Sequence, residues 1–349
     1  MKILVLYTRL SDYFIACLKK DIAINNNFFL VFRDNPSKQA PFSFKSEKNL
    51  KIYNESNFKK NEILEKAAAF KPDLVYVSGW KNKKYLFLAK YYKSKGINVI
   101  LTMDNHWKKE LKQYFFTLFS RFFLLSRFTH IWIPGQPQYE YAKKLGFNEN
   151  KIIAGLYCAN ENLFRTIDRS KFNKQILFIG RLVEHKGLRI LFNVINELIK
   201  DKKLNFKFHF VGNGPLLNHI PKHPNIKHTQ FINPIDLPNI FKNAGIFILP
   251  SLYEAWGVVI HEAVLSGLPV ITTYQTGASS DFVINNKNGF LYDAKNEKEL
   301  KNIILRSMNM PYSEYFKMSR NSKNLSDKIN LTNWSCLLYT SPSPRDPSI

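Results

Sequence analysis

Two glutamates bracket the start of one expected helix and give the clearest sign of chemistry in this chain. Glu254 follows a buried-strand pattern and a Pro-Ser turn, and Glu262 lies two helical turns further on, with seven residues between them. Carboxylate oxygens accept hydrogen bonds from sugar and ribose hydroxyls, and a helix N-terminus attracts a phosphate. The spacing therefore predicts a site for a sugar joined to a nucleotide. The alternatives are an exposed acid that the helix dipole favours at Glu254, and an ion pair with a neighbouring lysine at Glu262.

Two cations precede this segment at another strand-to-helix junction. Arg181 and Lys186 lie close to Gly180 and Gly187, after the apolar strand pattern of 176–179. A nucleoside diphosphate leaving group gains negative charge as its bond to the sugar breaks, and fixed cations stabilise that charge. A guanidinium binds a phosphate in bidentate fashion, whereas an ammonium acts as a point charge. We expect both side chains to contact a diphosphate; the alternative is that they are ordinary exposed cations.

A glycine pair and an aromatic residue lie between these two motifs. Gly212 and Gly214 flank Asn213 at the end of the expected strand 208–211, a spacing that by itself often only turns the chain. Phe231 follows in the next loop. Their position between the cations and the glutamates makes them candidates for contact with the same ligand.

Together these segments resemble, in the same order, the motifs of retaining glycosyltransferases of the GT-B type, family 4, whose signature is a pair of glutamates separated by seven residues. The resemblance is specific from about 175 to 293. It implies that Glu254 contacts the hydroxyls of the donor sugar, that Glu262 contacts the ribose, and that both cations contact the diphosphate. Donor-binding positions that the resemblance further implies are Gly180, Gly212, Gly214, Phe231, Ala255, Trp256, Gly257 and Val258. Asn233 stands where the family usually has a glycine in a loop that contacts the base, so the resemblance does not assign the nucleotide base of the donor.

The first half of the chain matches that family less well. Asp104 and His106 follow the expected strand 99–103, near where the family often has a His-Asp pair that faces the donor sugar, but their order differs. We include both among the candidate catalytic residues, with a surface imidazole as the alternative for His106. The family's glycine-rich loop after the first strand is replaced by residues 8–12, where Arg9 either substitutes for backbone phosphate contacts or belongs to an acceptor loop.

The length of 349 residues exceeds what one core usually holds and predicts two domains. Apolar strand patterns alternate with helical stretches, which is typical of βαβ units and parallel sheets. We therefore predict an α/β protein with two Rossmann-like, doubly wound domains, and the resemblance implies that they face each other across a cleft. The expected boundaries are an acceptor domain over 1–165, a donor domain over 166–311, a helix over 312–335 that crosses back to the first domain, and a disordered or non-native tail over 336–349.

Composition bears on the cellular compartment and on the partners that the chain can have. Three scattered cysteines, Cys17, Cys158 and Cys336, predict neither a disulfide framework nor a metal cluster and favour a reducing compartment. The N-terminus begins on a strand pattern without a signal-peptide cleavage site, and the longest apolar region is too short to span a bilayer. The formal charge of +24 is shared by both halves; residues 1–170 carry 29 Lys and Arg against 14 Asp and Glu, a balance of +15. Solvated lysines are the simplest explanation, and nucleic acid or an anionic membrane are the alternatives.

Residues 108–128 combine cations with many phenylalanines. Leu111, Phe115, Leu118, Phe122 and Leu125 recur at helical spacing, although other faces of the same helix are apolar too. The favoured interpretation is a helix whose stripe packs against the sheet. The alternative is an interfacial helix that rests on anionic lipid.

The predicted activity is transfer of a sugar from a UDP- or GDP-linked donor to a hydroxyl, with retention, without a metal and without a cofactor. The acceptor is expected to be a saccharide or a lipid-linked saccharide of cell-surface polysaccharide or glycolipid synthesis. The protein is expected in the cytoplasm, where the inner face of a bacterial membrane is one place for it. The alternatives are a sugar-nucleotide epimerase or hydrolase of the same fold, a basic nucleic-acid-binding protein, and an inactive donor-binding partner subunit. No nucleic-acid motif is present, so nucleic acid is not the expected partner.

Overall fold

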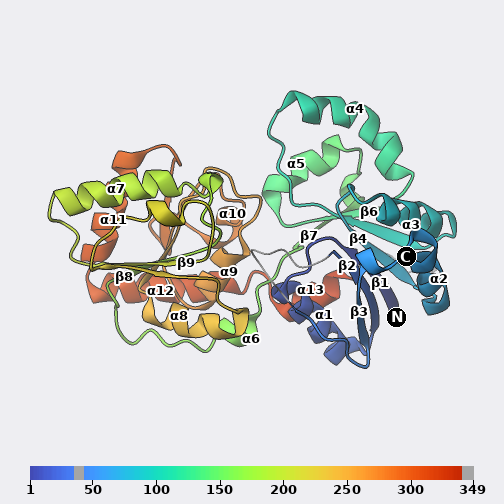
Figure 1. Ribbon diagram of the computed structural model, residues 1–349, viewed down its shortest axis with the longest axis horizontal. Helices are drawn as coiled ribbons and strands as arrows, with labels where there is room; N and C mark the ends of the chain where they lie inside the picture. Colours follow the sequence, from blue (N-terminus) through green and yellow to red (C-terminus); the bar gives the residue numbers. More distant parts are fainter. Residues whose placement is uncertain (35–42, 340–349) are drawn as a thin grey trace. The chain divides into compact units, whose positions relative to one another are not determined.

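The computed structural model describes residues 1–34 and 43–339, which form two compact units. The first unit contains Met1–Cys158 and the chain from Leu331 on, and the second contains Ala159–Asn330. The chain therefore passes between the units twice. Each unit is a parallel sheet wrapped by helices (Figure 1).

Within the described residues, the first unit has a seven-stranded parallel sheet in the order β3-β2-β1-β4-β5-β6-β7. Its strands are β1 (Lys2–Tyr7), β2 (Phe28–Arg33), β3 (Leu50–Asn54), β4 (Leu74–Ser78), β5 (Asn98–Thr102), β6 (His130–Ile133) and β7 (Ile152–Ala154). Its helices are α1 (Asp12–Asn25), α2 (Lys60–Phe70), α3 (Lys83–Ser94), α4 (Leu111–Leu125), α5 (Gln136–Lys144) and α13 (Leu331–Leu337). The order reverses between β1 and β4, as in doubly wound sheets.

Alternate strand residues of the first sheet enter two different cores, because successive side chains point to opposite faces. Leu4 and Val77 pack with side chains of α2 and α3, such as Leu88, on one face. On the other face Tyr76 packs against Phe14 of α1, with ring centroids 5.6 Å apart. Both faces are therefore covered, which explains why the strands read as continuous apolar runs.

Within the described residues, the second unit has a six-stranded parallel sheet in the order β10-β9-β8-β11-β12-β13. Its strands are β8 (Gln175–Ile179), β9 (Lys207–Val211), β10 (Ile226–Thr229), β11 (Ile246–Leu249), β12 (Val270–Thr273) and β13 (Gly289–Tyr292). Its helices are α6 (Glu161–Phe164), α7 (Leu188–Lys200), α8 (Leu237–Asn243), α9 (Val258–Leu265), α10 (Ser279–Phe282), α11 (Glu297–Asn309) and α12 (Tyr312–Ser326), with a 3-10 turn η3 (Glu184–Lys186) before α7. Leu188, Leu191, Ile195 and Leu198 give α7 its buried face at helical spacing.

The predicted fold class is confirmed, since both halves are doubly wound parallel sheets. The structure divides the chain at Cys158–Ala159, several residues before the expected boundary at 165. The expected crossing helix over 312–335 is two helices: α12 belongs to the second unit and contacts α9, and α13 belongs to the first and contacts α1. Residues 336–339, expected to be disordered, include the end of α13, and 340–349 lie outside the described residues.

Helix α4 corrects another prediction. The stripe expected to pack against the sheet is largely exposed, with Leu111 at 75%, Phe115 and Leu118 at 66% and Phe122 at 80%. The opposite face supplies the packing instead, through residues such as the fully buried Leu124. Among the described helices, none combines the length and apolar character needed to cross a bilayer.

Candidate functional site

The second sheet changes winding direction between β8 and β11. From β8 the chain moves through β9 to β10 on one side, and it then returns to place β11 on the other side of β8. The loops that leave the carboxyl ends of β8 and β11 therefore diverge, and ligands of open α/β sheets bind in the crevice that such loops form. The predicted cations follow β8, and the predicted glutamates follow β11.

These two loops touch through their backbones. Gly187, after η3, has φ +68°, and a Cβ there would collide with the carbonyl oxygen of Pro250 at the end of β11. The backbone N–H of Leu252 donates to the carbonyl oxygen of His185 at 2.9 Å, which ties the same loops together. Only glycine combines this left-handed conformation with so close an approach. The positions of η3 and of the segment after β11 are thus fixed jointly.

Lys186 and Glu254 meet where the two loops converge. The Lys186 ammonium donates to Oε2 of Glu254 in an ion pair whose side chains are only 11% and 17% exposed. The hydroxyl of Ser251 also donates to this oxygen, at 3.5 Å. The sequence assigned the lysine to a diphosphate and the glutamate to a sugar, and the structure brings both into one site. An ammonium and a carboxylate are therefore held side by side, away from bulk water.

A cluster of buried threonines supports the loop that carries Glu254. The Thr273 hydroxyl donates to the carbonyl oxygen of Ser251 at 2.6 Å, and the Thr272 hydroxyl donates to that of Leu249 at 2.8 Å. Thr276 lies within 3.2 Å of both hydroxyls. The sequence analysis missed these residues, although paired threonines at the end of an expected strand were a usable signal. They satisfy carbonyl groups that leave the sheet and so fix the loop.

The backbone on either side of Glu254 is paired as well. The Glu254 N–H donates to the carbonyl oxygen of Gln275 at 3.2 Å, and its own carbonyl accepts from the N–H of Gly277 at 3.0 Å. Trp256, a predicted donor-binding residue, is only 3% exposed, and its ring packs edge-on against Phe282. Its indole therefore belongs to the core of the second unit.

Helix α9 begins directly after Gly257 and has two distinct faces. Ile260 and Val264 are buried in the core. Val258 and Glu262, four residues apart, share a face of the helix, and both are half-buried. Glu262 thus lies on the side of α9 that is left partly open to solvent, where a carboxylate can accept hydrogen bonds from a ligand.

The predicted glycine pair has a structural role that can be read directly. Gly212, at φ +131° after β9, approaches the carbonyl oxygen of Gly180, and Gly214 approaches that of Leu182, so that a Cβ at either position would collide. These glycines let the loops after β8 and β9 pack backbone to backbone. The structure therefore brings Gly180 and Gly212 together.

The remaining predicted residues of this unit lie at the same edge of the sheet. Arg181 is exposed after β8, and its guanidinium makes no hydrogen bond or ion pair with the other residues that the structure describes. Ala255 is half-buried in the segment before α9. Phe231 is half-buried after β10, next to the loop that holds Gly212, whose N–H donates to the carbonyl oxygen of Thr229.

Asp104 and His106 belong to the first unit, after β5. The Tyr157 hydroxyl donates to Oδ2 of Asp104 at 3.1 Å. Burial, followed by the nearby Asp104 carboxylate, raises the pKa of Tyr157, and burial also raises the pKa of Tyr7. The sequence analysis missed these two tyrosines, because neither belongs to a motif. His106 is half-buried, and its carbonyl oxygen accepts from the amide of Gln113 at 2.8 Å.

The loop after β1, which lacks the expected glycines, is held by hydroxyl groups. Thr8 Oγ1 lies 2.8 Å from Ser78 Oγ at the end of β4, and the Thr8 N–H donates to the same oxygen at 3.3 Å. These contacts join the two strands at the point where the first sheet changes winding direction. Arg9 is exposed beside them.

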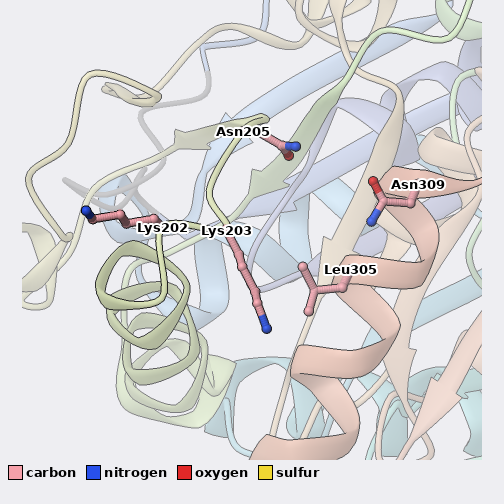
Figure 2. A pocket seen from close by; sticks show the side chains of 5 residues that line it. All are labelled: Lys202, Lys203, Asn205, Leu305 and Asn309. Carbon is pink, nitrogen blue, oxygen red and sulfur yellow. The ribbon is translucent and has the colours of Figure 1, made fainter.

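A hollow of about 410 Å³ lies elsewhere in the second unit (Figure 2). Its lining residues are Lys202, Lys203, Asn205, Leu305 and Asn309. Asn205 precedes β9, so the hollow is at the amino ends of the strands, whereas Glu254 follows a carboxyl end. Lys202 points away from the helix that carries Leu305 in Figure 2. We assign no ligand to this hollow.

Comparison with known proteins finds similarity to glycosyltransferases. Residues 160–325 match the family model described as Glycosyl transferases group 1. An uncharacterized glycosyltransferase of Methanocaldococcus jannaschii is 29% identical over 204 residues, which are 51% of this chain and 54% of that protein. The capsular polysaccharide biosynthesis glycosyltransferase CapM of Staphylococcus aureus is 29% identical over 180 residues, 46% of this chain and 47% of that protein. The chain thus spans about half the length of these relatives.

Solved structures match over nearly the whole chain. Anabaena Alr3699/HepE in complex with UDP has a TM-score of 0.75 at 16% identity and covers 97% of this chain and 98% of its own. WaaG, a glycosyltransferase involved in lipopolysaccharide biosynthesis, has a TM-score of 0.67 at 14% identity and covers 96% and 97%. At these identities the likeness concerns the fold, which is that of GT-B glycosyltransferase structures.

Proposed function

We propose that this chain transfers a sugar from a UDP- or GDP-linked donor to a hydroxyl acceptor with retention of configuration, as in glycosyltransferase family 4. The observation that carries the proposal is the ion pair of Lys186 and Glu254 at the point where the second sheet changes winding direction. The match of residues 160–325 to Glycosyl transferases group 1 supports it, as do similar structures that contain UDP or UDP-glucose.

The ion pair suggests how a donor is bound. When a diphosphate enters, the Lys186 ammonium turns from the carboxylate to a phosphate oxygen, and Glu254 accepts hydrogen bonds from sugar hydroxyls instead. The exposed guanidinium of Arg181 binds the diphosphate from the β8 side, and the free N–H groups at the start of α9 complete its environment. Glu262, on the open face of α9, accepts from the ribose hydroxyls.

Catalysis then follows from orientation and charge. The bond between the anomeric carbon and the phosphate oxygen breaks as the acceptor oxygen attacks the same face of the sugar. The acceptor proton passes to the departing diphosphate oxygen, so that a protein nucleophile is not required. Lys186 and Arg181 stabilise the charge that develops on the diphosphate, and we propose that transfer needs no metal. Full activity in EDTA supports that part of the proposal, and loss of activity that Mg²⁺ restores contradicts it.

The first unit supplies the acceptor side in this proposal. Asp104 accepts from Tyr157 at the carboxyl end of β5, a place where a carboxylate can orient an acceptor hydroxyl. We propose a saccharide or lipid-linked saccharide of cell-surface polysaccharide or glycolipid synthesis as the acceptor. The capsular relative and the lipopolysaccharide enzyme among the similar structures support this class.

The test begins with donor binding. Thermal unfolding is followed with UDP-, GDP- and ADP-sugars, each with and without an acceptor mixture. A donor at one hundred times its Kd stabilises the folded protein by about 2.7 kcal/mol, which raises the unfolding temperature of a unit of this size by roughly 5 to 10 °C. The Lys186→Met variant, if folded, should lose this shift. A wild type that no sugar nucleotide stabilises contradicts the proposal.

Product analysis then separates transfer from its nearest alternative. NMR of the anomeric centre shows whether configuration is retained. Donor that is consumed equally fast without any acceptor would instead identify a sugar-nucleotide hydrolase or epimerase of the same fold.

A further inference from the structure

Helix α4 presents an unusually apolar surface. In the first unit of Figure 1 it lies beside α5, with one side turned away from the strands. Six large apolar side chains of α4 are 47% to 80% exposed: Leu111, Tyr114, Phe115, Leu118, Phe119 and Phe122. We call these six residues the apolar stripe. Their spacing of three, four and seven residues places them on one face of the helix, over an arc of roughly 140°.

The other side of α4 is well anchored, so the exposed face is not a loose segment. Phe116 stacks on Trp80 with centroids 5.4 Å apart and an interplanar angle of 12°. Ser120 and Leu124 are fully buried, and the Ser120 hydroxyl lies 3.4 Å from the carbonyl oxygen of Leu145. The helix therefore holds the apolar stripe in a fixed outward orientation.

Cations border the apolar stripe on both sides. At 100° per residue, Lys112 lies at one edge of the arc and Arg121 lies at the other, and both are exposed. Lys108 and Lys109 are exposed just before the helix. Over residues 108–127 the chain carries five Lys and Arg against a single acid, Glu110. An apolar face bordered by cations is the pattern of helices that lie in the plane of an anionic membrane surface.

We propose that α4 docks the protein on an anionic lipid bilayer, with the apolar stripe inserted at the level of the headgroups and acyl chain ends and the bordering cations on lipid phosphates. Charge complementarity selects this occupant. A second copy of the chain would bring the same cations toward one another, whereas anionic lipid neutralises them. Tyr114 at one edge suits an interface, because its ring is apolar and its hydroxyl is polar.

The inference does not depend on the proposed transfer reaction, and vesicle binding is measured without donor or acceptor. The full chain is sedimented with vesicles of phosphatidylcholine alone and with vesicles that contain 30% phosphatidylglycerol. We expect strong partition onto the anionic vesicles, weak partition onto the neutral ones, and a decline with rising salt. A wild type that stays in the supernatant with anionic vesicles overturns the proposal.

Two variants separate the contributions of apolar and of charged side chains to vesicle binding. Phe115→Ser, Phe119→Ser and Phe122→Ser together should lower the partition coefficient on anionic vesicles at least about 100-fold. Lys109→Gln with Lys112→Gln should lower it roughly 30-fold on anionic vesicles and leave it unchanged on neutral ones. All five side chains are exposed, so both variants should keep the fold, which near-UV circular dichroism checks.

A matched control removes three exposed apolar side chains elsewhere, through Ile24→Ser, Phe87→Ser and Ile284→Ser. This control should bind vesicles like the wild type. Equal loss in the control and the α4 variant would show non-specific adhesion and refute the proposal. Light scattering tests whether a second copy of the chain binds the apolar stripe instead. A wild-type dimer that becomes monomeric in the triple phenylalanine variant would show this and would also refute the membrane proposal.

Discussion

Replacing Lys186 by methionine should separate the structural role of its ion pair with Glu254 from its chemical role. The substitution keeps the length and apolar stem of the side chain but leaves the Glu254 carboxylate, 17% exposed, without its cation. Removing one partner of a buried ion pair costs 3 to 5 kcal/mol, and the partial exposure here lowers the expected loss to about 3 kcal/mol. Transfer should fall at least about 100-fold, since one fixed cation on the leaving group is lost.

The double variant Lys186→Met with Glu254→Gln gives the decisive comparison. Without the carboxylate there is no uncompensated charge, so the two stability losses should be non-additive by about 2 kcal/mol. Activity, by contrast, should stay as low as in the single variant, because both proposed donor contacts are gone. Stability thus recovers in part while chemistry does not.

Hydrogen exchange measures these losses in each unit separately. A loss of about 3 kcal/mol should speed exchange of the slowest amides in β8 and β11 roughly 150-fold, while peptides from β1 and β4 serve as an internal reference in the other unit. Lys301→Met is a matched control, because its partners Glu197 and Asp201 are 54% and 38% exposed and these ion pairs should contribute little. Strictly additive losses, or equal changes in both units, would refute the assigned role of the pair.

Further predictions concern the backbone, pH and the first unit. Gly187→Ala should destabilise the second unit by at least about 2 kcal/mol, because it combines a left-handed φ with a collision at Pro250, and a normal urea midpoint would contradict this. Burial lowers the pKa of His261 to about 4, well below that of the unfolded chain, so its contribution should be complete above about pH 7 and lost as pH falls from about 6.5 to 4. The stability advantage of the wild type over His261→Gln should shrink by up to about 3 kcal/mol over that range in urea titrations at each pH, and a constant difference would count against it. Tyr157→Phe removes the hydrogen bond to Asp104 and should weaken acceptor use, read as a higher KM, while the thermal shift with donor stays unchanged.

The sequence predicted central strands such as β8 and β11 and their loops well, because both are short apolar runs that end in glycine, proline or charge. It missed β2, although that strand is a buried apolar run, and also edge strands such as β3 and β10, most of whose side chains are only partly buried and carry little apolar signal. The candidate residues that follow β8 and β11 were chosen from motifs, and the structure places them on neighbouring loops. That Lys186 and Glu254 contact each other was not predicted, because it depends on which strands are neighbours.

Two misses have the same physical origin. The threonine cluster around Thr273 supports the loop of Glu254 from an adjacent strand. Tyr157 bonds to Asp104 although it lies 53 positions later in the chain. For α4, periodicity picked out one apolar stripe although other faces were apolar too, and the orientation predicted from it was wrong. Tertiary partners such as Trp80 decide which face is buried. Local sequence patterns thus locate the helices and strands, whereas predicting the contacts between them requires knowledge of the fold.

The late position of Trp334 has a consequence for biosynthesis. This indole is fully buried in the first unit, stacks on Trp132 with centroids 5.2 Å apart, and donates to the carbonyl oxygen of Leu156 at 2.9 Å. A ribosome releases it only after the whole of Ala159–Asn330 has been made. During synthesis the first unit therefore lacks the side chain that fills this part of its core. The second unit is one continuous segment and can complete its folding first, which is the reverse of the usual order from the N-terminus.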